Sequence, residues 1–126
     1  MKAKAAVAPL LECLKDEDGS VRHAAARALG EMKVEAAVSP LLECLKDKDR
    51  FVRFAAARDL GGMKVEAAVS PLLECLKDKD GSVRHAAARA LVEMKVEAAV
   101  ESLIPLINED DTRDDALLAL WEISQT

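Results

Sequence analysis

The stretch that decides the fold reads VRHAAARALGEM and runs from Val21 to Met32. It returns as VRFAAARDLGGM over Val52–Met63 and as VRHAAARALVEM over Val83–Met94, each copy 31 residues after the one before. A sequence that repeats with a period of roughly 20–50 residues builds its fold by stacking copies of one small unit, not around one central core. The 126-residue chain is therefore predicted to be a repeat array that forms a single domain, residues 1–126.

Each unit is predicted to contain two helices joined by a polar turn. The first helix of the first unit carries apolar residues at helical spacing: Val7, Leu10, Leu11 and Leu14. These side chains form one face that we expect to be buried, together with Leu29 of the second helix. Asp18 in the turn suits the N-cap of that second helix. Repetition of the pair predicts an all-α solenoid of eight helices. Its four units span about 2–32, 33–63, 64–94 and 95–124.

The last unit departs from the pattern of the other three. Its turn, 108–112, is one residue shorter, and its last helix contains Trp121, the only tryptophan of the chain. A terminal unit needs a changed outer face because no further unit stacks on it. We interpret the last unit as a C-terminal cap in which Trp121 is a lid on the core. A ligand-stacking role of Trp121 is the alternative.

The composition favours closely packed helices that stay in water. Apolar residues make up 51% of the chain but aromatic residues only 2%. The net charge of −5 at pH 7 disfavours nucleic acid as a partner. No apolar run approaches the length that crosses a bilayer. The N-terminus leads into a helical pattern and not into a signal peptide, so no membrane contact is expected.

One cysteine occupies the same site in each of the first three units: Cys13, Cys44 and Cys75. Stacked helices lie about 8–10 Å apart, whereas the Cα atoms of a disulfide lie within about 7 Å. We therefore expect buried free thiols, and free thiols indicate a reducing compartment such as the cytoplasm.

The repeated residues match a known pattern. The sequence VRxxAAxALGxM, preceded by PLLxxLKDxD, resembles the HEAT-like repeat of the phycobilisome-lyase type and engineered repeat proteins built on that consensus. The resemblance covers essentially the whole chain. It implies a right-handed superhelix of the HEAT and armadillo kind, in which the second helix of each unit lines the concave side. It also implies ion pairs between arginines and turn aspartates: Arg22, Arg53 and Arg84 with Asp16 or Asp18 and their equivalents.

The junctions between units differ from this family, which usually joins units through Gly-Asp-Pro. The chain has Lys33-Val34-Glu35, Lys64-Val65-Glu66 and Lys95-Val96-Glu97 instead, and none of these is a helix breaker. Longer helices fused across the junctions, exchanged between chains, are therefore an alternative architecture. Gly30, Gly61 and the prolines favour breaks. Pro9 is expected near the start of its helix, and Val92 makes the third junction the most prone to remain helical.

The second unit differs from the first and third units at five positions: Arg50, Phe51, Phe54, Asp59 and Gly62. Phe51 and Phe54 are the only phenylalanines of the chain, and their spacing puts them on one face of a helix. The resemblance places that face in the concave groove, beside a row of basic residues: Arg27, Arg58 and Arg89, flanked by His23 and His85. Asp59 is expected to pair with Arg27 or Arg89 across units, with a ligand contact as the alternative.

Exposed aromatic side chains among arginines are typical of a protein-binding hot spot. The predicted function is a non-enzymatic interaction scaffold that holds an unknown protein or peptide on the concave face. The predicted binding residues are Phe51, Phe54, Arg50, Arg58, Gly62, His23, Arg27, His85 and Arg89. The alternative is that the phenylalanines only pack on the aliphatic parts of neighbouring arginine side chains and bind no partner.

Other functions stay open. Nucleic acid could meet the arginine row while Phe51 and Phe54 stack on bases. The chain could also be an engineered or duplicated array without a natural ligand, or an accessory subunit of bilin attachment, and it could self-associate through the phenylalanines. Catalysis is not expected, because nothing orients His23 toward Ser20. No metal or cofactor is expected either, since His23 and His85 lie two units apart.

Overall fold

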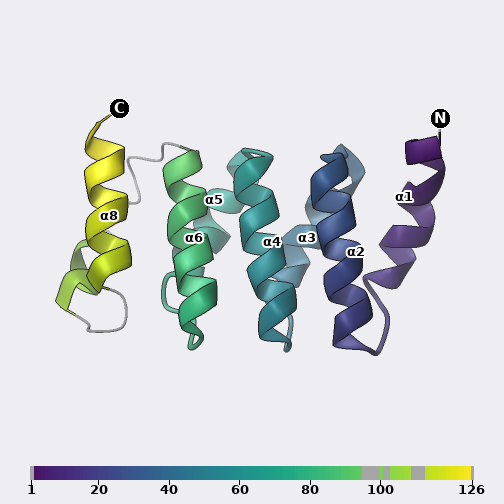
Figure 1. Cartoon of the computed structure of the whole chain (residues 1–126), viewed down its shortest axis with the longest axis horizontal. Helices are drawn as coiled ribbons and strands as arrows, with labels where there is room; N and C mark the ends of the chain where they lie inside the picture. Colours follow the sequence, from purple (N-terminus) through teal and green to yellow (C-terminus); the bar gives the residue numbers. More distant parts are fainter. Residues whose placement is uncertain (1, 95–99, 101–102, 109–112, 126) are drawn as a thin grey trace.

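The computed structural model describes residues 2–94, 100, 103–108 and 113–125, and these residues form helices joined by short turns (Figure 1). The first helices of the units are α1 (Lys2–Cys13), α3 (Val38–Cys44) and α5 (Val69–Cys75). The second helices are α2 (Gly19–Met32), α4 (Arg50–Gly62), α6 (Gly81–Glu93) and α8 (Arg113–Ser124). The described residues also form three short 3₁₀ helices: η1 (Glu35–Ala37), η2 (Glu66–Ala68) and η3 (Ile104–Asn108).

The helices form two layers. Figure 1 shows α2, α4, α6 and α8 side by side in one row, with α3 and α5 behind it. The two ends of the chain lie at opposite ends of the long axis. This arrangement confirms the predicted all-α solenoid. The count of four units and the hand of the superhelix stay predictions.

Aspartate side chains start the second helices, as expected for Asp18. Asp18, Asp49 and Asp80 are the N-cap residues of α2, α4 and α6, in extended backbone conformation. Each carboxylate accepts a hydrogen bond from the backbone N–H two residues later, at 2.7–2.9 Å. These bonds satisfy N–H groups that have no partner inside the helix, so each cap fixes where a second helix begins.

Two lysines end the helices at the first two junctions. Lys33 and Lys64 adopt the left-handed conformation, with φ of 51° and 54°. At the second junction the N–H of Val65 bonds to the carbonyl of Leu60, which closes a Schellman-type turn around Lys64. The alternative of fused helices is therefore wrong at these two junctions. The third, 95–99, lies outside the described residues, although α6 already ends at Glu93.

The prolines occupy two different positions. Pro40 and Pro71 are the third residues of α3 and α5, where the N–H has no helical partner. Pro9 was expected at such a place, and that expectation is wrong. α1 begins at Lys2, so Pro9 lies inside the helix. The difference arises because η1 and η2 precede α3 and α5, whereas α1 is helical from its first described residue.

The core is a stack of leucines separated by alanines. Leu29, Leu60 and Leu91 of the second helices are completely buried, as predicted for Leu29. Leu41 and Leu72, the equivalents of Leu10, are also completely buried. Small residues allow the second helices to approach closely. A Cβ added to Gly61 would lie 2.4 Å from the Cβ of Ala90, so a larger residue there would push α4 and α6 apart. Leu10 and Leu11 are only half-buried.

Arginines join the first unit to the second, and the second unit to the third, through buried ion pairs. The guanidinium group of Arg22 donates to the Asp47 carboxylate at 2.9 and 3.0 Å, and to the carbonyl of Asp16 at 2.7 Å. Arg53 repeats the arrangement with Asp78 at 2.9 and 3.2 Å. The predicted arginine–aspartate pairing is therefore confirmed for Arg22 and Arg53, with the partner carboxylate in the following unit. For Arg84 the equivalent turn, 109–112, lies outside the described residues. Because each guanidinium bridges two turns, the pairs fix the stacking register.

The electrostatics of the first pair follow from its burial. Burial alone raises the pKa of Asp47, but the hydrogen bonds from Arg22 and from the Asp49 N–H outweigh it and leave the pKa below its usual value. A carboxyl group with a lowered pKa stabilises the fold above its ordinary pKa, and it loses that contribution as the pH falls.

The three cysteines are free thiols, as predicted. Cys44 and Cys75 are buried, and burial raises the pKa of each thiol to about 11. Cys13 is only half-buried, because α1 is covered from one side. A pKa in this range keeps the two buried thiols protonated and unreactive at neutral pH.

Trp121 does not cover the core, so its predicted role as a lid is wrong. It is 61% exposed, whereas Ala116, Ala119 and Ile123 of the same helix are buried. These three recur at helical spacing and turn one side of α8 inward, which leaves Trp121 on the other side. No described helix is long and apolar enough to cross a membrane.

Candidate functional site

The predicted binding residues all lie on the second helices. We call the surface formed by these nine residues the second-helix face. His23 and Arg27 come from α2, five residues including Phe51 and Phe54 come from α4, and His85 and Arg89 come from α6. All are exposed or half-buried. Arg50 and Gly62 mark the two ends of α4, and six residues of the predicted set line two clefts along it. The other three, His23, His85 and Arg89, line neither of these two clefts.

The first cleft surrounds the phenylalanines. A cavity of about 300 Å³ lies between α4 and α6. It is lined by Arg50, Phe51, Phe54, Asp80 and Ser82. Phe51 is 56% exposed, whereas Phe54 is half-buried and packs against the core. The prediction of two exposed aromatics is therefore confirmed for Phe51 and too strong for Phe54.

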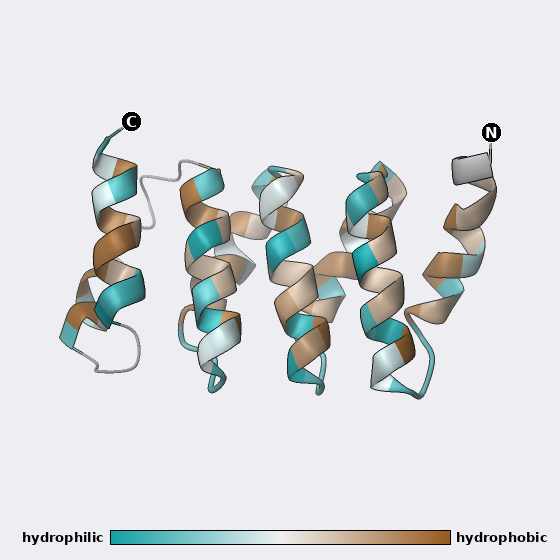
Figure 2. Cartoon of the chain, viewed as in Figure 1, coloured by the Kyte–Doolittle hydropathy of each residue, from teal (hydrophilic) through white to brown (hydrophobic). Residues whose placement is uncertain are grey.

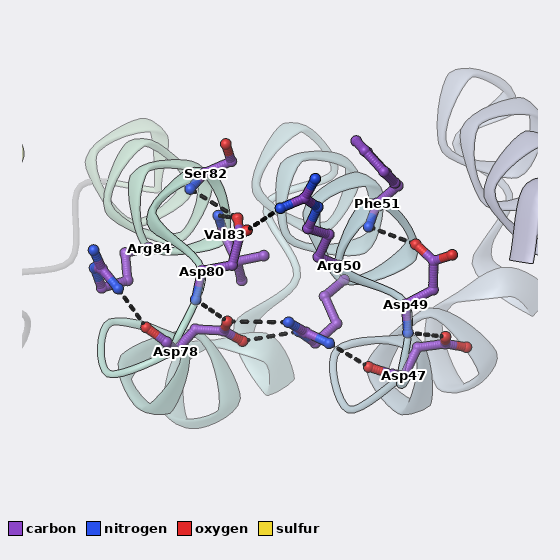
Figure 3. A network of polar contacts seen from close by, with 10 residues as sticks. Asp47, Asp49, Arg50, Phe51, Asp78, Asp80, Ser82, Val83 and Arg84 are labelled. Carbon is purple, nitrogen blue, oxygen red and sulfur yellow. Dashed lines mark hydrogen bonds and ion pairs between the residues drawn. The ribbon is translucent and has the colours of Figure 1, made fainter.

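The ring of Phe51 is held between two neighbours. The guanidinium of Arg50 lies 5.0 Å from the ring centroid, within the range of a cation–π contact. The same guanidinium reaches the Asp80 carboxylate at 3.4 Å (Figure 3). The imidazole of His23 approaches the ring edge-on, with 6.4 Å between centroids. Phe51 is thus oriented by contacts from the first two units, while 56% of the residue stays exposed to water.

Each arginine of the basic row lies beside a carboxylate that balances its charge. Arg27 pairs with Glu31 at 3.7 Å, and Arg58 pairs with Asp59 at 3.3 Å. In the third unit Arg89 reaches Glu122 at 3.0 Å. His85 contacts Asp115 of α8 at 2.6 Å. These last two contacts tie α6 to the last unit. The row therefore alternates in charge, and it is not a basic strip.

The second cleft lies one turn further along the helices. It has a volume of about 440 Å³ and combines three basic with three acidic side chains. It is lined by Arg27, Gly30, Glu31, Lys33, Arg58, Asp59, Gly62 and Glu93. A Cβ added to Gly62 would meet nothing within 4 Å, so Gly62 widens this cleft and does not serve close packing.

Asp59 is the residue whose partner the sequence failed to predict. It receives hydrogen bonds from its neighbour Arg58, not from Arg27 or Arg89 as expected. Its side chain is 7% exposed and lies against Gly30, and its Oδ2 is buried without a hydrogen-bond partner among the described residues. Burial raises the pKa of Asp59 to about 6, against the opposing effect of Arg58. The carboxyl group therefore destabilises the fold when it is charged.

Replacing Asp59 with alanine, the residue of the first and third units, is expected to stabilise the chain at pH 7. Since one pKa unit corresponds to about 1.4 kcal/mol, the gain in unfolding free energy is about 1–3 kcal/mol. The native carboxyl contributes its full stability below its unfolded pKa and loses it as the pH rises through about 6. The gain should therefore shrink toward pH 4. Urea unfolding at pH 7 and at pH 4 measures the gain in unfolding free energy. An equal gain at both pH values would contradict the explanation that the buried charge of Asp59 destabilises the native chain.

The sequence missed several residues that line the clefts. Asp80 is the N-cap of α6 and Ser82 lies in its first turn, and both reach the first cleft because α6 packs against α4. The N-cap position of Asp80 was a detectable signal, but its approach to Arg50 depends on this packing. Within the described residues, no group of three or more His, Cys, Asp or Glu side chains could hold a metal ion.

Comparisons with known proteins agree with the fold. The family model for HEAT repeats matches residues 1–58 and 45–121. The complex of CpcE and CpcF of phycocyanin lyase from Nostoc sp. PCC7120 is similar, with 29% identity and a TM-score of 0.82 over 92% of this chain and 52% of that one. Human deoxyhypusine hydroxylase is similar with 28% identity and a TM-score of 0.79, over 95% and 44% of the two chains.

An engineered protein shares the fold at 24% identity and a TM-score of 0.68, over 96% of this chain and 63% of that one. A search of curated proteins gave no match. The chain spans about half the length of the lyase and hydroxylase structures that it resembles. The family match extends over most of the chain and agrees with the two layers of paired helices. This chain belongs to the HEAT repeat proteins.

Proposed function

We propose that the chain is a non-catalytic scaffold that holds a protein or peptide on its second-helix face, with Phe51 at the centre. The observation that carries the proposal is the exposure of Phe51, which is 56% and lies beside a cleft. The first and third units have a serine at the equivalent position. An aromatic ring that is oriented by neighbours but left in water can enter an interface with little loss of side-chain entropy.

The chemistry of the two clefts suggests the class of partner. The cleft at Phe51 offers an apolar wall with Asp80 at its edge, and the cleft at Gly62 offers charges of both signs. This combination suits a peptide segment with an apolar residue followed by charged residues. The proposal places the protein in the cytoplasm, where the thiols of Cys44 and Cys75 stay reduced.

Two alternatives have weaker support. Nucleic acid needs a row of cations, but Arg27, Arg58 and Arg89 each have a carboxylate partner. A role as accessory subunit in bilin attachment is compatible with the similarity to the CpcE–CpcF complex. The similarity covers about half of that structure, and no residue of the two clefts gives this role independent support. The likeness to an engineered protein concerns the fold alone.

The test is affinity capture with the native chain and with the double variant Phe51→Ser, Phe54→His, which restores the residues of the other units. We expect a captured protein to be lost by at least about tenfold in the variant, because central aromatic residues dominate binding energy. The matched control is Glu43→Ser on α3, away from the second-helix face, which should capture normally. A partner held equally by the double variant would contradict the proposal, and a loss that follows salt concentration steeply would indicate nucleic acid.

A further inference from the structure

The second unit carries two substitutions that bring no evident structural benefit, and both lie next to Arg58. Asp59 and Gly62 stand where the first and third units have alanine and glutamate. The Asp59 side chain is buried, and one of its oxygens has no hydrogen-bond partner among the described residues. Gly62 serves no close packing, because a Cβ there would meet nothing within 4 Å. Positions that break a local pattern without a structural gain are those where a functional role is expected.

Arg58 uses only one edge of its guanidinium group. Its Nε and Nη2 groups both donate to Oδ1 of Asp59, at 3.4 and 3.3 Å. Its Nη1 group makes no hydrogen bond within the part of the chain that the structure describes. Arg22 and Arg53 differ, because their Nε and Nη2 groups bind a carboxylate and their Nη1 group donates to a backbone carbonyl. We call the Nη1–Nη2 side of Arg58 the free edge.

The free edge belongs to the second cleft. Arg58 lines this cleft and its side chain is 43% exposed, whereas the Asp59 side chain is 7% exposed. The edge that is bound to Asp59 is therefore the shielded one, and the free edge is the one that a ligand reaches. In the first unit Arg27 has Glu31 as its partner, four residues later. Gly62 occupies that place after Arg58, so no side chain one turn further along α4 covers the free edge.

The accessible charges of the second cleft favour a ligand with a single negative charge. Figure 2 shows hydrophilic segments side by side on α2, α4 and α6, the helices that line this cleft. Lys33 is exposed and has no ion pair with a described residue. Because Asp59 is buried, the ligand would meet three cations and two carboxylates: Arg27, Lys33 and Arg58, with Glu31 and Glu93. One excess positive charge suits a carboxylate, whereas a phosphate, with about two negative charges, would be repelled more strongly by the glutamates.

We propose that the free edge of Arg58 binds a carboxylate side chain of the partner in the second cleft. Two N–H groups on one edge of a guanidinium match the two oxygens of a carboxylate, so the contact is directional as well as charged. Asp59 holds the opposite edge from below and thereby orients the group. The inference rests on the proposed function, since it gives the partner a second contact besides Phe51.

The spacing of the two contacts defines the partner segment further. Arg58 follows Phe51 on α4 by two helical turns, which correspond to about 10 Å along the helix. An extended peptide covers this distance in about three residues. The acidic residue of the partner should therefore stand about three positions from the apolar residue that contacts Phe51.

Selection from a phage library of random peptides tests the inference, with the enriched sequences read by deep sequencing. We expect the native chain to enrich peptides in which an apolar residue stands about three positions from an aspartate or glutamate. The Gly62→Glu variant should keep the apolar residue and lose the acidic preference, because the added carboxylate lies one turn after Arg58 and occupies its free edge. A Cβ at this position meets nothing, so the variant should fold like the native chain.

The matched control is Ser70→Glu, which adds the same charge at an exposed position of α5. It should enrich the same peptides as the native chain. Fluorescence polarisation with the most enriched peptide then measures the contact. Replacing its acidic residue with the neutral amide should weaken binding to the native chain about tenfold and binding to Gly62→Glu by less than about twofold.

The outcomes separate this inference from the proposed function. Apolar enrichment without an acidic residue, or an acidic preference that survives in Gly62→Glu, would overturn the carboxylate site and leave the binding role of Phe51 standing. A preference lost equally in Ser70→Glu would also overturn it, because overall charge would then be the cause. If Phe51→Ser enriches the same peptides as the native chain, or no peptide is enriched at all, both proposals are overturned.

Discussion

Asp78→Ala is expected to lower the free energy of unfolding by about 3–5 kcal/mol, because it leaves the Arg53 guanidinium buried without its carboxylate. The Arg53 side chain is 8% exposed, and its two hydrogen bonds to Asp78 are 2.9 and 3.2 Å long. The carbonyl of Asp47 still accepts from Arg53 in the variant, but a carbonyl does not neutralise the charge. Chemical denaturation monitored by circular dichroism measures the loss.

The repeat provides a matched control for this change. Asp16 occupies the same place in the first unit, and its carboxylate accepts from the Asp18 N–H as that of Asp78 accepts from the Asp80 N–H. Asp16 is exposed, and Arg22 donates to its backbone carbonyl; no arginine of the described residues donates to its carboxylate. Asp16→Ala therefore removes the turn contact alone and should cost about 1 kcal/mol or less. Equal losses at the two positions would contradict the role of the buried ion pair.

Leu60→Ala is expected to destabilise the chain by about 2–5 kcal/mol, the usual cost of removing a buried leucine side chain and leaving a cavity. Leu60 is completely buried in α4, which packs against both α2 and α6. A defect in a central unit weakens its contacts with both neighbours, and in a solenoid those contacts supply much of the stability. Thermal and denaturant unfolding give the change.

Leu118→Ala is the control for the leucine substitution, since Leu118 is 44% exposed in α8. It should change the free energy of unfolding by no more than about 0.5 kcal/mol in dilute solution. A loss below about 1 kcal/mol for Leu60→Ala would mean that α4 is not held by its leucine face.

Local chemistry made much of the fold predictable. The aspartate caps and the leucine spacing depend on neighbours within one or two helical turns, so the sequence displays them directly. Arg22 was also expected to meet a turn aspartate, but the bond to Asp47 depends on how two units stack. The left-handed Lys33 and Lys64 escaped prediction because lysine rarely adopts this conformation, and tertiary packing outweighs its cost here.

The candidate site was predictable in some of its residues but not in its geometry. The comparison of equivalent positions singled out Phe51 and Gly62, and the structure puts them at two different clefts. Trp121 was misjudged because the buried side of α8 is set by its packing against α6, which spacing alone does not reveal. The partner of Asp59 was missed for a similar reason. Arg58 folds back on its neighbour, a rotamer choice that the repeat pattern does not encode.

The central claim is that the second-helix face holds a partner protein, and site-specific photo-crosslinking tests it most directly. A photoreactive phenylalanine analogue at position 51 would stand in for an aromatic ring that is 56% exposed. The same analogue at position 43, on α3, would sample the first-helix side. We expect a covalent adduct with one cellular protein from position 51 and none from position 43. Adducts from position 43 alone, or the same adducts from both positions, would contradict the claim.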